Sequence, residues 1–200
     1  MIFDRFCFRY QSIVFLATLN NTDFLELLNL GVRMNQPIVI QLQELALDSS
    51  NNISDLLRKA LLIATKLELQ DFKQWILNEL NGYTDIGQVP DYRRTTGEVK
   101  AYNSVQGRYI PFVVDNVEIM KTLQTVILHE SIDSLQHAVK ESEKKTKLIS
   151  YSYPPEIENM LMSWQNTRSP VIPTQFIGVT QFVAIMDKVR TRILEWSLSL

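Results

Sequence analysis

The sequence predicts an α+β fold in which an N-terminal helical unit packs with a small β-sheet and a long C-terminal helix. Three observations favour this class. Between residues 37 and 80, apolar side chains recur every three or four positions, as they do along one face of a helix. Beyond Gly82 the pattern changes to short runs rich in β-branched and aromatic residues. From Phe182 onward a single apolar stripe returns at helical spacing, which predicts one long closing helix.

The first half should contain three helices, at residues 37–47, 53–67 and 70–80. Asn52 or Ser54 can cap the free amides at the start of the second helix. The third helix should stop at Asn81-Gly82, because glycine adopts the left-handed conformation without a clash at Cβ. Since short loops join the three helices, we expect them to pack as one antiparallel unit.

The second half alternates short strands with helices. After the turn-like residues 89–92, strands are expected at residues 98–102, 108–114, 148–153 and 171–177. Helices are expected at residues 117–128, 131–143, 156–164 and 182–200. The first two strands are separated by the polar segment 103–107, so they form the most favoured hairpin.

The composition is typical of a globular protein. The 200 residues carry a net charge of −2, with 46% hydrophobic and 21% charged residues, which excludes disorder as a description of the whole. No apolar run approaches the roughly 18 to 20 residues of a membrane span, so no membrane role is expected. The single cysteine, Cys7, cannot close an intramolecular disulfide, and a cytoplasmic, reduced setting is therefore the default.

Charge differs between segments. Residues 34–91 hold four basic and eight acidic side chains, which gives no electrostatic reason to approach a phosphate backbone. Residues 92–114 reverse this balance, and lysines cluster again between residues 140 and 147. Neither basic segment reaches the charge typical of a dedicated nucleic-acid-binding protein.

Residues 1–33 differ from the rest of the chain in composition and in apolar periodicity. They contain five of the nine phenylalanines and keep neither a helical nor a strand period for long. We expect them to be an N-terminal extension outside a domain of residues 34–200, with translation from Met34 as the simplest explanation. Two alternatives are a signal peptide, although no small-residue cleavage site follows the apolar stretch, and one short amphipathic helix at residues 22–28.

The search for catalytic signatures is negative. The sequence contains no glycine-rich phosphate loop, no Cys-x-x-Cys, no His-Glu-x-x-His and no Gly-x-Ser-x-Gly. We therefore predict no catalytic, cofactor-binding or metal-binding residues and no cofactor. His129 and His137 are interpreted as surface residues. The aromatic and methionine residues within or beside helical stripes are interpreted as core, namely Trp75, Trp164, Trp196, Met160 and Met162.

One constellation of residues is a candidate binding site. Tyr92, Arg93 and Arg94 precede the predicted hairpin, and Arg108 lies on its second strand. Across a hairpin these cations could converge on a phosphate or on an acidic partner surface. The alternative interpretation is a strand edge that charge protects from aggregation.

Three runs of residues carry a family resemblance: Glu44–Ser50, Ser54–Ala60 and Phe72–Tyr83. They resemble the AbiTii domain of bacterial abortive-infection proteins. Further landmarks follow in the same order: Val89–Arg93, Gly97, the Pro111 region, Pro154-Pro155 and Val189–Leu200. The resemblance covers Met34–Leu200 and is most specific up to Tyr83.

The resemblance implies an intracellular role in defence against bacteriophage. It also implies that such a domain lies at the N-terminus of a longer protein with a variable C-terminal region, and it supplies no catalytic residues. We expect a non-catalytic sensing or protein-interaction domain whose partner is a protein or an effector region. The alternative is a nucleic-acid-binding or nuclease-accessory protein that uses the basic hairpin. An enzyme with an unfamiliar site is a third hypothesis.

Overall fold

The structure is a computed structural model that describes residues 37–143, 147–165 and 170–200. The expectations for residues 1–33, including the short helix at residues 22–28, lie outside these described residues. Part of the second lysine cluster, at residues 144–146, lies outside them too.

Helices and strands occupy most of the described chain. The helices are α3 (Ile38–Leu47), α4 (Ile53–Lys66), α5 (Gln70–Asn81), α6 (Val117–Gln124), α7 (Ile132–Glu143), α8 (Pro155–Trp164) and α9 (Val179–Leu198). Two short 3₁₀ turns are η1 (Ile86–Gln88) and η2 (Asp91–Arg93). The strands are β1 (Arg94–Thr96), β2 (Glu98–Asn103), β3 (Arg108–Pro111), β4 (Thr125–Ile127), β5 (Leu148–Ser152) and β6 (Pro173–Gly178).

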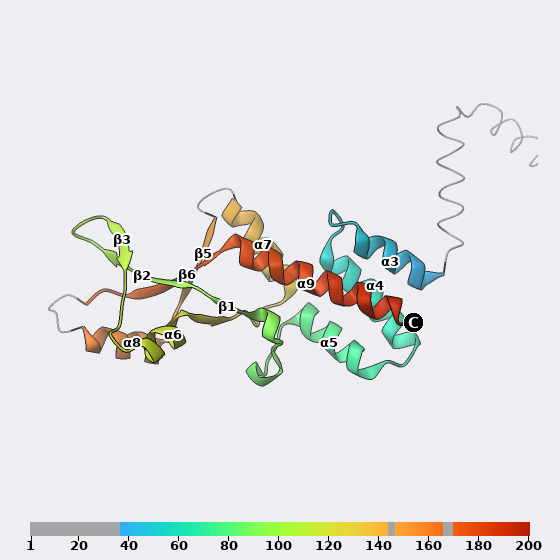
Figure 1. Cartoon of the computed structure of the whole chain (residues 1–200), viewed down its shortest axis with the longest axis horizontal. Coiled ribbons are helices and arrows are strands. Elements are labelled where there is room, and N and C mark those ends of the chain that lie inside the picture. Colours follow the sequence, from blue (N-terminus) through green and yellow to red (C-terminus); the bar gives the residue numbers. More distant parts are fainter. Residues whose placement is uncertain (1–36, 144–146, 166–169) are drawn as a thin grey trace, which may run out of the picture.

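The molecule is elongated, with helices at one end and a sheet at the other (Figure 1). At one end α3, α4 and α5 pack with the C-terminal part of α9, and at the other a four-stranded sheet lies beside α6 and α8. Helix α7 and the small β1–β4 sheet lie between them. The predicted α+β class, with an N-terminal helical unit, a small sheet and a long C-terminal helix, is confirmed.

The larger core lies in the helical unit and extends along α9. Helix α4 buries its apolar stripe, and Asn52 caps its start by accepting hydrogen bonds from the backbone amides of Ser54 and Asp55. Helix α9 inserts Phe182, Ile185, Val189 and Ile193 into the same core. The spacing of three and four residues brings these side chains to one face, so burial of that face holds the long helix in place.

Polar contacts fasten α9 to the start of the domain. The Arg190 guanidinium donates to the carbonyl oxygen of Asp48 at 2.9 Å and to that of Asn51 at 2.7 Å. Gln43 on α3 donates its amide hydrogen to the carbonyl oxygen of Ser197 at 2.9 Å. Arg190 therefore satisfies carbonyl groups that the end of α3 and the following loop leave without helical partners.

The four-stranded sheet has the order β3-β2-β6-β5, and every neighbouring pair is antiparallel. The predicted hairpin is its β2–β3 edge, where Tyr102 lies opposite Tyr109. One face of the sheet packs on a second, smaller core around Val99, Tyr153 and Leu161. Helices α6 and α8 contribute to this core and therefore cover that face of the sheet.

The expected helix at residues 117–128 is wrong at its C-terminal end. Helix α6 stops at Gln124, and Thr125–Ile127 form β4, which pairs with β1 in a separate two-stranded sheet. Three consecutive β-branched residues favour an extended backbone at this point. Pairing with β1 supplies the hydrogen bonds that continuing the helix would have supplied.

Gly82 ends α5 in a conformation that other residues avoid. Its φ of 88° and ψ of 163° lie in a region that is almost exclusive to glycine. A Cβ atom at this position would lie 3.0 Å from the carbonyl oxygen of His129. The chain can therefore turn out of α5 and pass close to the residues before α7 only with glycine here.

Replacing Gly82 with alanine is expected to lower the free energy of unfolding by about 1 to 3 kcal/mol. Gly107 at the hairpin tip is the matched control, because its φ is 63° but no atom lies within 4 Å of the added Cβ. Urea unfolding of both alanine variants checks the prediction. An effect of Gly107→Ala equal to that of Gly82→Ala would show that the close approach to His129 contributes nothing.

Candidate functional site

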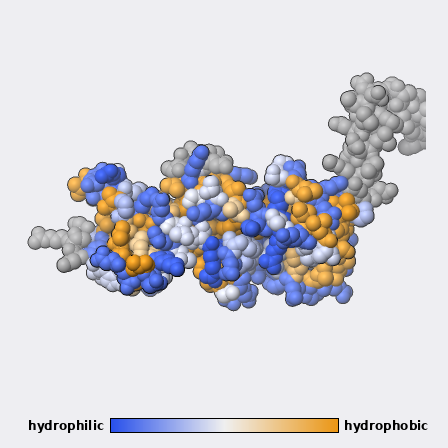
Figure 2. All heavy atoms as spheres, in the orientation of Figure 1, coloured by the Kyte–Doolittle hydropathy of each residue, from blue (hydrophilic) through white to orange (hydrophobic). Residues whose placement is uncertain are grey.

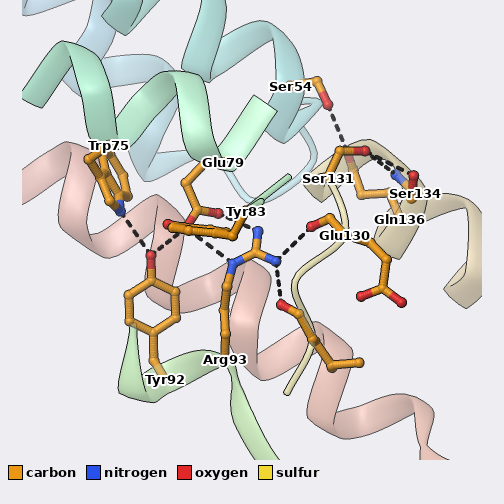
Figure 3. A network of polar contacts seen from close by, with 11 residues as sticks. Ser54, Trp75, Glu79, Tyr83, Tyr92, Arg93, Glu130, Ser131, Ser134 and Gln136 are labelled. Atoms are coloured by element: carbon orange, nitrogen blue, oxygen red, sulfur yellow. Dashed lines mark hydrogen bonds and ion pairs between the residues drawn. The ribbon is translucent and has the colours of Figure 1, made fainter. Parts of the chain in front are cut away.

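A buried ion pair lies where the helical unit meets the rest of the chain (Figure 3). Glu79 on α5 and Arg93 at the end of η2 both have side chains that are 0% exposed. The Arg93 Nη2 atom lies 2.5 Å from Glu79 Oε2, and Nε donates to Oε1 at 3.2 Å. A bidentate contact of this kind fixes both the distance and the orientation of the two groups.

Arg93 also binds the segment that follows β4. Its Nη1 atom donates to the carbonyl oxygens of Leu128 at 2.9 Å and Glu130 at 2.8 Å. One guanidinium thus joins α5, η2 and the segment before α7, which are far apart in the sequence (Figure 3). Because four hydrogen bonds occupy the buried group, the pair serves to hold these three segments together.

Aromatic side chains complete the network. The hydroxyl groups of Tyr83 and Tyr92 donate to Glu79 Oε1 at 2.7 and 2.5 Å, and the indole N–H of Trp75 donates to the Tyr92 hydroxyl oxygen at 2.9 Å. Burial, and then the charge of Glu79, raise the pKa of both tyrosines. Both hydroxyls therefore stay protonated donors well above the pH at which a free tyrosine ionises.

Glu79 is a residue that the sequence analysis did not single out. It stands three residues after Ile76 and four after Trp75, so it falls on the apolar face of α5. A carboxylate at such a position is rarely buried without a partner. That single acidic residue within an apolar stripe was the available signal for a buried cationic partner.

The structure separates the four residues of the predicted binding constellation. Tyr92 and Arg93 belong to the buried network, whereas Arg94 is exposed and lies 3.5 Å from the Asp91 carboxylate. Arg108 is on β3, at the far edge of the four-stranded sheet, where its Nε donates to the Gln106 side chain at 3.1 Å. Arg93 and Arg108 thus do not converge, because η2 lies near the middle of the molecule and β3 near its sheet end (Figure 1).

An apolar groove of about 670 Å³ opens beside the smaller core. It lies between α6, β4, β5 and α8, and we call it the α6–α8 groove. Its apolar walls include Ile119, Val126, Tyr153, Ile157, Met160 and Trp164. The amide of Gln175 lines it as well and donates to the carbonyl oxygen of Leu123 at 2.6 Å, which ties β6 to the end of α6.

Two groove residues correct the expectation that tryptophan and methionine are core. Trp164 is 47% exposed and Met160 is 37% exposed, although Trp75 is buried as expected. Helix α8 is amphipathic, but the sheet accepts only the side of it that carries Leu161. Met160 and Trp164 therefore remain at the surface along the groove.

The helices that border the groove carry acidic residues in their first turns. Glu118 lines the groove, and Glu156 and Glu158 lie in the first turn of α8. Tyr151 also lines the groove. Burial, and then the charge of the neighbouring Glu130 carboxylate, raise the pKa of its hydroxyl group. The groove is therefore mainly apolar and has one acidic side chain, Glu118, among its lining residues.

Within residues 37–143, 147–165 and 170–200, no group of three or more His, Cys, Asp or Glu side chains is arranged to hold a metal ion. His129 and His137 are both exposed, one before α7 and one on it. In the same part of the chain, none of the helices combines the length and the apolar character that crossing a membrane requires.

The fold and these features define an α+β domain with a buried polar junction and an exposed apolar groove. The AbiTii family model matches residues 37–200, a range that contains every element from α3 to α9. The chain therefore belongs to the AbiTii family. No curated protein and no solved structure matches it. The family name suggests a bacterial abortive-infection protein and hence a part in antiviral defence.

Proposed function

We propose that the chain is a non-catalytic sensing or protein-interaction domain of a bacterial phage-defence protein, acting in the cytoplasm. The observation that carries this proposal is the α6–α8 groove with its exposed apolar side chains. Contiguous apolar surface is costly to leave in water, so it commonly marks a binding site. The partner is a protein or an effector region that presents an apolar anchor.

The composition of the groove supports a protein partner. Tryptophan contributes more than most residues to the affinity of interfaces, and methionine adapts its shape to different apolar groups. Trp164 and Met160 stand side by side along α8, one turn apart. Because Glu118 lines the groove, and Glu156 and Glu158 lie in the first turn of the helix that borders it, a partner with basic residues beside its apolar anchor fits best.

Replacing Trp164 with alanine is expected to weaken partner binding by about 30-fold or more, the loss typical of a residue that dominates an interface. Leu62 is the matched control, because it lies on α4 and is 48% exposed against 47% for Trp164. The measurement is affinity capture by the full chain from phage-infected and uninfected cells, scored together with phage plating efficiency.

The expected result is a partner that wild type and Leu62→Ala retain and Trp164→Ala loses, with loss of phage resistance in that variant alone. Retention of every partner and of full resistance by Trp164→Ala would overturn the role of the groove. Thermal melting of both variants checks that the substitutions leave the fold intact.

A further inference from the structure

The four-stranded sheet has one covered and one open face. Alternate residues of β2 and β6 point to the helices and are buried: Val99, Ala101, Gln175 and Ile177. The residues between them, on the opposite face, are half-buried or exposed along β2, β6 and β5. Since side chains alternate along a strand, the described part of the chain covers one face of this sheet and leaves the other to solvent.

Aromatic rings gather on the open face. Tyr102 on β2 and Tyr109 on β3 lie opposite each other in the hairpin, with ring centroids 5.4 Å apart. The Tyr109 ring also reaches across β2 to Phe176 on β6, at a centroid distance of 4.8 Å. We call these three residues the aromatic platform. It spans three adjacent strands. The space-filling view shows hydrophobic and hydrophilic residues mixed at the surface of the sheet end of the molecule (Figure 2).

The platform is accessible. Tyr102 is 49% exposed and Tyr109 is 50% exposed, and both contact each other edge to face. Cross-strand aromatic pairs stabilise a sheet even when they bind nothing, so the pair alone does not identify a ligand. The further observation is the charge beside the rings.

A cation borders the platform on the same hairpin. The Lys100 ammonium group lies 5.7 Å from the centre of the Phe176 ring and 2.5 Å from the Glu98 carboxylate. Arg108 does not belong to this group, because it lies opposite Asn103 at the start of β3 and its side chain therefore points to the other face from Tyr109. Rings that can stack, together with an ammonium group that can approach a phosphate, match the chemistry of a nucleotide chain.

We propose that the open face of the β3-β2-β6-β5 sheet binds single-stranded nucleic acid through the aromatic platform. Tyr102 and Tyr109 stack on unpaired bases, and Lys100 contacts a phosphate between them. A duplex fits poorly, because its bases are already stacked on one another and present only their edges. This surface and this ligand are separate from the α6–α8 groove, so the inference does not depend on the proposed protein partner.

The inference assigns the hairpin a different set of residues from those the sequence suggested. Arg93 is committed to Glu79, and Arg94 lies on β1 outside this sheet. Stacking supplies what the modest charge of the hairpin lacks, since each stacked base adds about 1 to 3 kcal/mol of binding free energy. Binding should therefore show little sequence preference and only a moderate dependence on salt.

Fluorescence anisotropy of the full chain with a labelled single-stranded oligothymidylate of about 15 nucleotides tests the inference. Tyr102→Ala and Tyr109→Ala are each expected to weaken binding by about 5- to 150-fold, the range that corresponds to one lost stacking contact. Tyr102→Phe and Tyr109→Phe are the matched controls, because they keep the ring and should stay within a few-fold of wild type. Lys100→Ala should weaken binding and reduce its dependence on salt.

Three results would overturn the inference: no binding by the wild type at protein concentrations of about 0.1 mM, unchanged binding by both alanine variants, or equal binding of a duplex of the same length. Ultraviolet cross-linking of the wild-type chain to the oligonucleotide does not depend on how the variants fold. Cross-links within residues 98–111 or 173–178 support the inference, and cross-links confined to other peptides contradict it.

Discussion

Arg93→Ala is expected to lower the free energy of unfolding by about 3 to 5 kcal/mol. The substitution removes the guanidinium group but leaves the Glu79 carboxylate fully buried next to two tyrosines. It also takes the donor away from the carbonyl oxygens of Leu128 and Glu130. Removing one partner of a buried ion pair costs more than the pair itself contributes, because the remaining charge has lost both water and its counter-ion. Chemical denaturation with urea measures the effect.

The neighbouring arginine is the control for this substitution. Arg94 makes a single 3.5 Å contact with an exposed carboxylate, so Arg94→Ala should leave the stability almost unchanged. A double variant that replaces Glu79 with leucine and Arg93 with methionine should recover the part of the loss that comes from the unpaired charge. The carbonyl oxygens of Leu128 and Glu130 still lack their donor in this variant. Equal stabilities of Arg93→Ala and Arg94→Ala would refute the structural role of the pair.

Phe182→Ala is expected to lower the free energy of unfolding by about 3 to 5 kcal/mol. Phe182 is fully buried in the first turn of α9, and its ring lies nearly parallel to that of Tyr151 on β5, at a centroid distance of 6.5 Å. Alanine would leave a cavity where α9 meets the sheet, and rigid elements on both sides would prevent its collapse. The loss should appear as a lower urea midpoint with an unchanged slope.

Val183 is the matched control, since it is the next residue of α9 and is 38% exposed. Val183→Ala should lower the free energy of unfolding far less than Phe182→Ala, because the Val183 side chain buries much less apolar surface than the Phe182 ring. Comparable effects of the two substitutions would show that the junction between α9 and the sheet is not tightly packed.

Local signals in the sequence were sufficient for the regular elements. Helix α4 begins at the asparagine cap and buries the stripe that its period indicates, and the β2–β3 hairpin forms around the predicted turn. These elements depend on contacts between residues close in the sequence, such as a cap and its amides or a strand and its immediate neighbour. Gly82 ends α5 as expected, although its backbone is extended with a positive φ.

Sequence patterns did not reveal the pairings between segments that lie far apart along the chain. The β1–β4 sheet joins residues about thirty positions apart, and neither three-residue strand has a period that could reveal it. Glu79 and Arg93 were visible as an acidic and a basic residue, but nothing local tells which charged side chains are buried. Trp164 looked like core because hydrophobic spacing reports the side of a helix and not whether another element covers it.

The sequence by itself determined the α+β class, the helical first half, the long last helix and the AbiTii family, because these depend on periodicity, caps and ordered motifs. Only the tertiary structure decided which arginine is buried, which face of the sheet is open and which apolar side chains line a groove. The physical reason is that burial depends on what packs against a residue from elsewhere in the chain. The buried junction, the α6–α8 groove and the aromatic platform all arise from such long-range packing.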